Sequence, residues 1–201
     1  YYRGFARAAA LPISPLSPNY SDVLAAKYAY DEGVSLTQAV KDGAVAGASV
    51  VLLVNSDDTL RVRVAREIAK SLSACGLSVT TSELSTSKYK KALQQGAYDL
   101  YLGQTKLSPN MDLSAFFSNK GALNYGRISD VALYTLCTES LANHGNYYTL
   151  HKNLMDDGRL CPILFRSYAI YAVRGLLTGL APARDNVFYY SLGKTMEKAK
   201  I

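Results

Sequence analysis

Residue types that perform catalysis occur in this chain, but their spacing assembles no complete catalytic site. The run Gly47-Ala48-Ser49 begins like the turn that carries a nucleophilic serine, yet Val51 stands where the second glycine belongs. Ser49 also enters a predicted strand, whereas the nucleophile of such a turn leaves one. No base, nucleophile and oxyanion-binding group are brought together elsewhere, and we therefore predict no catalytic residues and no enzymatic activity.

The pair Tyr148 and Lys152 has the Tyr-x-x-x-Lys spacing of short-chain dehydrogenases. Such an enzyme would need a Gly-x-Gly-x-x-Gly loop after its first strand, and this chain has neither that loop nor a P-loop. We interpret the pair as part of a helix surface and predict no cofactor.

Histidine and cysteine are too sparse to predict a metal site. His144 and His151 are the only histidines, and Gly145 is expected to break the helix that would align them. We expect both to be exposed or locally hydrogen-bonded. The cysteines form no Cys-x-x-Cys pair, which disfavours zinc and iron–sulfur sites, and their disulfide state stays open. They are Cys75, Cys137 and Cys161.

The composition is that of a globular protein. Of 201 residues, 49% are hydrophobic and 19% are charged, which excludes a disordered tail and a collagen-like repeat. The net charge is +6, but the basic residues occur in pairs and triplets rather than in one run. We interpret them as solvated surface and predict no nucleic-acid partner. No apolar stretch is long enough to predict a membrane-spanning helix.

The middle of the chain predicts alternating strands and helices. Residues 49–55 form an aliphatic, β-branched run that is typical of a strand buried on both faces. An amphipathic helix follows, and Gly76 is expected to end it. Its expected buried stripe is Leu60, Val64, Ile68 and Leu72.

A strand over 77–84, a helix over 88–95 and a strand over 98–103 complete a β-α-β-α-β order. This order predicts right-handed crossovers over a largely parallel sheet. Outside this region, the proline-rich residues 11–20 predict an extended surface segment. Residues 128–141 and 146–156 predict helices, and residues 163–177 and 186–191 predict strands.

Two stretches of the sequence have an order and spacing similar to those of a known family. The first is residues 49–117, and the second is LNYGRISD at 123–130, followed by RLCPILFRS at 159–167. Together they resemble the C-terminal lobe (lobe II) of family 5 extracellular solute-binding proteins. These are the oligopeptide, dipeptide and nickel receptors of ABC importers.

The resemblance implies an α/β fold, namely a periplasmic-binding-protein-like type II lobe with three layers, α/β/α, around a mixed, largely parallel sheet. It implies that residues 1–201 form a single α/β domain, a fragment of a two-lobed receptor. Residues 1–20 and about 175–185 would derive from the hinge. Four tyrosines are expected at the cut lobe boundary, where apolar exposure leaves a dimer open. They are Tyr1, Tyr2, Tyr189 and Tyr190.

The function implied by the resemblance is capture of a peptide or similar small solute for import. The partners would be that solute, the ABC permease and the missing N-terminal lobe. The intact protein would be lipid-anchored at the extracellular face of the cell membrane.

Ligands of open α/β sheets bind outside the carboxyl ends of the strands. Here those ends include residues 103–106 and the loop 107–112 that extends them. Amides and hydroxyls there would bond a peptide-like backbone, and Tyr125 would pack on a ligand side chain. The alternative is that these are loop residues that satisfy their own backbone. The predicted ligand face is Gln104, Thr105, Lys106, Asn110, Asp112, Asn124 and Tyr125.

The sequence departs from the family at this face. Gln104 follows Gly103, where the family usually has a Trp, and Leu107 stands where oligopeptide receptors have the Asp that binds the peptide's amino group. These departures weigh against generic dipeptide or oligopeptide specificity. Lys106 would favour a ligand with a negative group, unless its ammonium points to bulk water, and the identity of the ligand stays open.

A Rossmann-like α/β enzyme that acts on a small metabolite is the alternative function. A phosphate-binding loop at residues 54–60 would support it. However, Asn55-Ser56-Asp57-Asp58 brings negative charge to the place where the phosphate would lie.

Overall fold

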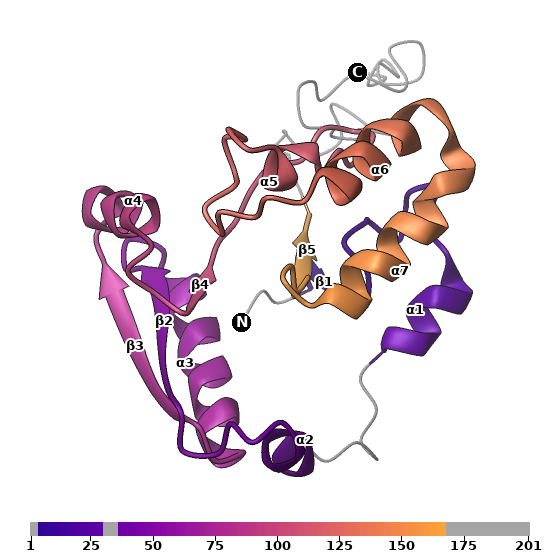
Figure 1. Ribbon diagram of the computed structural model, residues 1–201. Helices are drawn as coiled ribbons and strands as arrows, with labels where there is room; N and C mark the ends of the chain where they lie inside the picture. The colour runs from indigo at the N-terminus through magenta and orange to yellow at the C-terminus, as the bar shows by residue number, and fades with distance from the viewer. Residues whose placement is uncertain (1–3, 30–35, 168–201) are drawn as a thin grey trace, which may run out of the picture. The chain divides into compact units, whose positions relative to one another are not determined.

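The computed structural model describes residues 4–29 and 36–167, and the chain forms two compact units (Figure 1). Unit 1 contains the described residues of 29–105 and 116–129, and unit 2 contains those of 3–28, 106–115 and 130–201. The single domain over residues 1–201 and the hinge-derived segments stay predictions, and residues 175–185 lie outside the described ranges.

Unit 1 is built on a parallel sheet of three strands, in the order β3-β2-β4 (Figure 1). The strands are β2 (Ser49–Asn55), β3 (Ser78–Leu84) and β4 (Leu100–Leu102). The central strand, β2, pairs with β3 along its whole length and with β4 near its carboxyl end. Because all three strands are parallel, their carboxyl ends lie at the same edge of the sheet.

Two helices cover opposite faces of this sheet. Helix α3 (Thr59–Ala74) packs with Leu52 and Val54, whereas helix α4 (Thr86–Gln95) packs with Leu53. Successive side chains of a strand point to opposite faces, so the two helices lie on different sides. The predicted three-layer α/β/α arrangement is therefore confirmed in unit 1. Its sheet is parallel rather than mixed, because the antiparallel pairing of the described residues lies in a separate ribbon.

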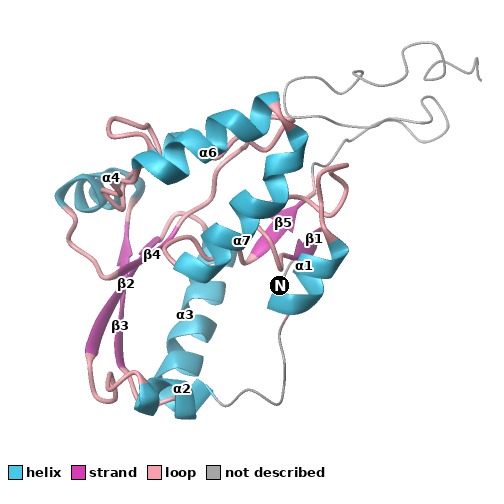
Figure 2. Cartoon of the chain, turned by 45° about the vertical axis from the view of Figure 1, so that its right-hand side comes forward, coloured by secondary structure: helices cyan, strands magenta, loops and turns pink. Residues whose placement is uncertain are grey.

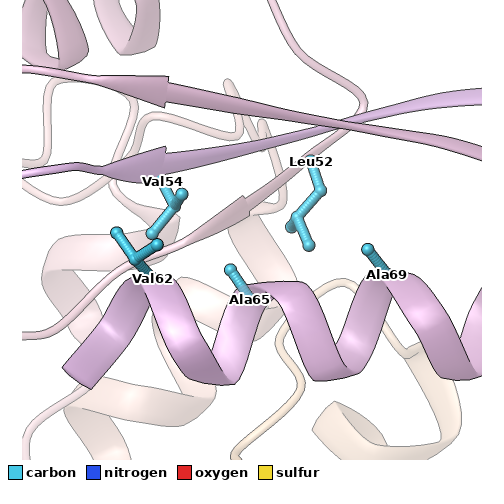
Figure 3. Close-up of a cluster of buried hydrophobic side chains, with 5 residues drawn as sticks. All are labelled: Leu52, Val54, Val62, Ala65 and Ala69. Carbon is cyan, nitrogen blue, oxygen red and sulfur yellow. The ribbon is translucent and has the colours of Figure 1, made fainter. Parts of the chain in front are cut away.

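The buried side of α3 is not the predicted one (Figure 3). Its buried residues are Val62, Ala65 and Ala69, which face Leu52 and Val54 of the central strand. The four residues of the predicted stripe are only partly buried. Small alanine side chains allow close packing of the helix on the sheet, and the larger aliphatic residues fill the margins of that contact.

The ends of α3 and α4 lie where capping signals predict them. The Asp58 carboxylate accepts a hydrogen bond from the backbone N–H of Arg61 at 3.0 Å and begins α3. Gly76 follows the last turn with a φ of 105°, and Gly96 ends α4 with a φ of 69°. Side chains rarely tolerate this left-handed backbone, which explains the two glycines. The short helix α2 (Leu36–Asp42) precedes the sheet in unit 1.

Unit 2 combines an antiparallel ribbon with helices (Figure 2). The ribbon pairs β1 (Ala6–Ala8) with β5 (Leu164–Arg166). The helices are α1 (Asp22–Tyr28), α6 (Val131–Ala142), the 3-10 turn η1 (His144–Asn146) and α7 (Tyr147–Asp157). The chain passes between the units within α5 (Ser114–Phe117).

Two predictions from the sequence differ from the structure in unit 2. Of the strand predicted over 163–177, the described part contains only β5, and residues 186–191 lie outside the described ranges. The proline-rich segment is not wholly at the surface, because Leu11 and Ile13 are fully buried. Residues 11–13 form bends rather than extended chain, and Pro12 between these two is buried as well.

One arginine joins the start of α6 to the end of α7. The Arg159 guanidinium donates to Asp130 at 2.6 Å and to Asp157 at 2.5 Å. Asp130 also caps α6 by accepting from the backbone N–H of Leu133 at 2.9 Å. These donors hold the pKa of Asp130 below its usual value. Within the described ranges, none of the helices combines the length and apolar character that a bilayer span requires.

Candidate functional site

The carboxyl edge of the sheet in unit 1 is closed by its own polar side chains. The Asp57 carboxylate accepts from the hydroxyl of Thr86 at 2.6 Å and from its backbone N–H at 2.9 Å. Asn55 donates to the same hydroxyl at 3.0 Å. These two bonds from Thr86 hold the pKa of Asp57 below its usual value. These bonds join the carboxyl ends of the neighbouring strands β2 and β3.

This closure bears on the alternative function. The helices that follow β2 and β3 lie on opposite faces, and such a switch point is where doubly wound α/β proteins bind nucleotides. Thr86 is the first residue of α4, and its N–H is a group that a phosphate would use. The Asp57 carboxylate already accepts from that N–H, so the negative charge predicted for residues 55–58 lies at the start of α4 as well.

Arg61 connects Asp58, in the loop after β2, to Gln104 of the predicted ligand face. One nitrogen of the Arg61 guanidinium, Nη2, lies 3.1 Å from an Asp58 carboxylate oxygen and 3.2 Å from the side-chain oxygen of Gln104. Gln104 is exposed and follows directly on strand β4 and Gly103. Within the described ranges its amide nitrogen makes no hydrogen bond, so its donors face solvent.

Tyr125 lies in a cluster of tyrosines in unit 1. Its ring contacts that of Tyr101 edge to face, with centroids 6.3 Å apart, and Tyr101 contacts Tyr98 in the same way at 5.2 Å. The Tyr98 hydroxyl donates to the backbone carbonyl of Tyr125 at 2.5 Å. Burial raises the pKa of both Tyr98 and Tyr101. Tyr125 is only half-buried, so part of its ring remains available.

Asn124 holds its own loop in shape. Its side-chain nitrogen donates to the carbonyls of Ser118 at 2.9 Å and Ile128 at 2.8 Å. Its side-chain oxygen accepts from the backbone N–H of Ile128 at 2.8 Å. Both amide hydrogens are therefore used within the loop, as the alternative interpretation of the predicted face expects. We assign Asn124 a positioning role.

In unit 2, the loop 106–112 carries three of the predicted residues. Asn110 and Asp112 are both tied to Ser108, whose hydroxyl donates to the Asn110 side chain at 2.5 Å and accepts from the Asp112 N–H at 3.2 Å. The Asp112 carboxylate accepts from the N–H of Ser114 at 2.8 Å. Lys106 is exposed and makes no hydrogen bond within the described ranges.

The predicted ligand face is divided between the units. Unit 1 holds Gln104, Thr105, Asn124 and Tyr125, and unit 2 holds Lys106, Asn110 and Asp112. Thr105 is exposed and, like Lys106, has no hydrogen bond to any residue in the described part of the chain. Within unit 1, Gln104 follows β4 and Tyr125 contacts Tyr101 of that strand, and within unit 2 Asn110 and Asp112 share one loop.

Sequence reasoning missed His151. The expectation that it is exposed or locally hydrogen-bonded is wrong, because it is 1% exposed and neither ring nitrogen has a hydrogen-bond partner in the described part. Burial lowers its pKa to about 4. A signal was present, since Tyr147, His151 and Leu154 recur at the spacing of one helix face, and all three are buried.

The other candidate groups have structural surroundings. Lys152 donates to Asp156 at 2.7 Å, and Tyr148 is 47% exposed, which confirms a helix surface. Among the described residues, no three metal-ligating side chains are grouped to hold an ion. All three cysteines are free thiols, with Cys75 and Cys137 buried and Cys161 exposed.

Comparison with known proteins identifies the fold. No family model matches the sequence, and no curated protein matches it. Solved structures do match, among them the binding protein AgaA from A. tumefaciens R10 in complex with agropinic acid, at 17% identity and a TM-score of 0.68. That match covers 82% of this chain and 36% of AgaA. This chain has the fold of part of a periplasmic solute-binding protein.

Two further structures agree. The ABC transporter-associated periplasmic binding protein DppA from Helicobacter pylori, solved with the peptide STSA, matches at 16% identity and a TM-score of 0.62 over 82% of this chain and 34% of DppA. NikA from Staphylococcus aureus, solved with Ni(L-His)2, matches at 10% identity and a TM-score of 0.63 over 92% of this chain and 42% of NikA. The chain thus spans less than half the length of these proteins, and the resemblance predicted from the sequence is confirmed for the fold.

Proposed function

We propose that this chain is the ligand-binding lobe of an ABC-importer solute-binding protein, and that it captures a peptide or similar small solute without chemical change. The observation that supports this most is the fold, with its parallel sheet between two helix layers in unit 1. The same fold occurs in proteins solved with agropinic acid, a peptide and Ni(L-His)2. These ligands differ in chemistry, so the fold supports binding of a solute and leaves its class to the side chains.

The contacts that we propose come from each unit separately. In unit 1, Gln104 and Thr105 present exposed polar groups beside the sheet edge, and the half-buried ring of Tyr125 offers an apolar surface. In unit 2, Lys106, Asn110 and Asp112 supply a cation, an amide and a carboxylate from one loop. Asn124 acts indirectly, by holding the loop that carries Tyr125.

The mechanism that we propose is a shift between open and closed states of a two-lobed protein. A ligand stabilises closure only by the difference between its affinities for the two states. The closed form would then dock on the permease at the extracellular face of the membrane, where a lipid anchor would hold the intact protein. This lobe alone would supply part of the contacts and bind more weakly. A dimer through the lobe boundary stays a prediction, because the terminal tyrosines lie outside the described ranges.

Native mass spectrometry of the full-length protein as purified tests the proposal, since a co-purified peptide or other solute is expected as a discrete added mass. Titration calorimetry of that solute then compares Gln104→Ala and Asp112→Ala with Gln95→Ala. Gln95 is an exposed glutamine at the end of α4 and serves as the matched control. Loss of one polar contact is expected to weaken binding by about tenfold. Unchanged affinity in both test variants would remove these residues from the site.

The Rossmann-like enzyme gains no support from the site. A nucleotide phosphate would have to displace the Asp57 carboxylate from the N-terminus of α4 and would meet its charge. The same titration with a nucleoside diphosphate is expected to give no heat of binding.

A further inference from the structure

Three aromatic rings form a column at the start of α7 in unit 2. The rings of His144 and Tyr147 are stacked, with centroids 5.9 Å apart and planes 10° apart. The centroids of the Tyr147 and His151 rings are 5.7 Å apart, and their planes are tilted by 41°. Tyr147 is 2% exposed and His151 is 1% exposed. Tyr147 therefore contacts one imidazole on η1 and another one turn further along α7.

The central ring of this column holds the loop 106–112. The Tyr147 hydroxyl donates to the backbone carbonyl of Asn110 at 3.0 Å. The next residue, Met111, has a positive φ of 55°, which is uncommon for a residue with a side chain. Its backbone N–H donates to the carbonyl of Ser108 at 2.9 Å. The loop thus keeps an unfavourable turn, and the Tyr147 hydroxyl ties it to α7.

His151 supports this ring without a polar partner of its own. Neither of its nitrogens is hydrogen-bonded in the described part of the chain. Burial is the cause of its lowered pKa, and no charged group contributes. The ionisable groups on α7 and on the elements near it include Tyr28 on α1, Asp112 in the loop, Cys137 on α6, His144 on η1, and Lys152 and Asp156 on α7.

Two of these groups share the interior with the column. Burial, and to a lesser extent the charge of Asp112, raises the pKa of Cys137 to about 12 and raises the pKa of Tyr147. Tyr28 and Lys152 are both bonded to Asp156 at the surface. Among the described residues, no carboxylate is hydrogen-bonded to His151, and an uncompensated buried charge is costly. A tilted tyrosine ring offsets only part of that cost.

We propose that His151 is a proton-sensitive positioning residue: in its neutral form it packs against Tyr147 and keeps the loop 106–112 in place, and its protonation releases that loop. A protonated imidazole gains by reaching water, and it leaves the column when it does so. Tyr147 then loses its support, and its hydroxyl loses the Asn110 carbonyl. The loop carries Lys106, Asn110 and Asp112, so acid would also weaken ligand binding. That consequence rests on the proposed function, whereas the loop release does not.

The pH window follows from the sign of the shift. The pKa of His151 is lowered by burial from 6.5 to about 4, so the released state binds more protons between these values. The packed state is therefore favoured above pH 6.5. As the pH falls from 6.5 toward 4, the equilibrium constant between the packed and the released state falls by up to about tenfold per pH unit for one proton.

Amide hydrogen exchange of the 201-residue chain without ligand tests the proposal. Protection factors, corrected for the intrinsic pH dependence of exchange, are measured at the N–H groups of Met111, Asp112 and Ser114 between pH 7 and 4.5. We expect them to fall by up to tenfold per pH unit below 6.5 in the wild type and in His144→Phe. We expect no such fall in His151→Phe, which keeps a ring but cannot be protonated. Tyr147→Phe keeps the column but removes the hydroxyl, so its loop is expected to exchange faster already at pH 7.

A titration of the wild type needs no variant to fold. The chain has two histidines, so the ring carbon–proton signals of His144 and His151 are separable by NMR, with His144→Phe providing the assignment. The midpoint of the His151 signal is expected below 6.5 and should track the loss of loop protection. Protection that does not change with pH, or that falls equally in His151→Phe, overturns the proposal. Since no ligand is used, failure of the proposed function would leave this result unaffected.

Discussion

A fully buried alanine of α3 packs against the sheet, so enlarging that residue is predicted to destabilise unit 1. Ala65 is fully buried and lies in one cluster with Leu52, at 3% exposure, and Val54, at 0% (Figure 3). Ala65→Leu adds three carbon atoms. Burying them without strain would stabilise by about 0.8 kcal/mol each. Extra carbons in a filled core instead force shifts with a net cost of about 1–3 kcal/mol.

We expect a net loss of about 2 kcal/mol for Ala65→Leu, which is about a thirtyfold change in the folding equilibrium. The assay is urea unfolding followed by hydrogen exchange of β2 and α3 peptides, which report on unit 1. The matched control is Ala74→Leu, the same substitution at an exposed position of the same helix. Surface substitutions of this kind change stability by less than about 0.5 kcal/mol.

A double variant tests whether volume is the cause. Leu52→Ala removes the same three carbon atoms from the facing strand, so combining it with Ala65→Leu restores the total volume of the cluster. The loss in the double variant is expected to be smaller than the sum of the two single losses, with a coupling of at least about 0.5 kcal/mol. Equal stability of Ala65→Leu and Ala74→Leu, or a coupling near zero, would refute the assignment of this face.

Two further predictions concern helix ends. Gly96→Ala is expected to destabilise α4 by about 1 kcal/mol because residue 96 has a left-handed backbone. The loss should be larger still because the new Cβ would lie 3.1 Å from the Arg127 guanidinium. Gly158→Ala is the control, since Gly158 is also left-handed but has open space around it, and equal losses of local exchange protection in the two variants would contradict the role of Arg127. Asp57→Ala is expected to speed hydrogen exchange of the Thr86 amide, which donates to that carboxylate. Acidification of the wild type below the usual titration range of an aspartate should do the same, because the pKa of Asp57 is lowered, so its contribution to stability is present above that range and lost as the pH falls. Unchanged exchange of the Thr86 amide in the variant would count against the cap.

Much of unit 1 could be predicted from the sequence because its signals act over a few residues. The β-branched run 49–55 coincides with β2, since apolar residues on both faces specify a strand between two layers. Asp58 and Gly96 mark helix ends because capping depends only on the neighbouring backbone. The sheet order required one more step, since the preference for right-handed crossovers does not fix which strand is central.

Less of the candidate site could be predicted from the sequence. The rule for carboxyl ends of strands located the edge that holds Gln104. It did not anticipate that both amide hydrogens of Asn124 are used within its own loop. Nor did it separate Lys106 from Gln104, which belong to different units. The conformation of the loop decides the first point and the packing of each unit decides the second, and residue spacing alone specifies neither.

The sequence by itself determined the alternation of strands and helices, the helix ends and the α/β class, because backbone propensity, capping and hydrophobic period are local properties. Only the tertiary structure decided which face of α3 is buried, that Leu11 and Ile13 reach a core, and that His151 has no hydrogen-bond partner among the described residues. Burial is a property of the groups packed against a residue. Those groups come from elsewhere in the chain, so their choice becomes visible only once the elements are assembled.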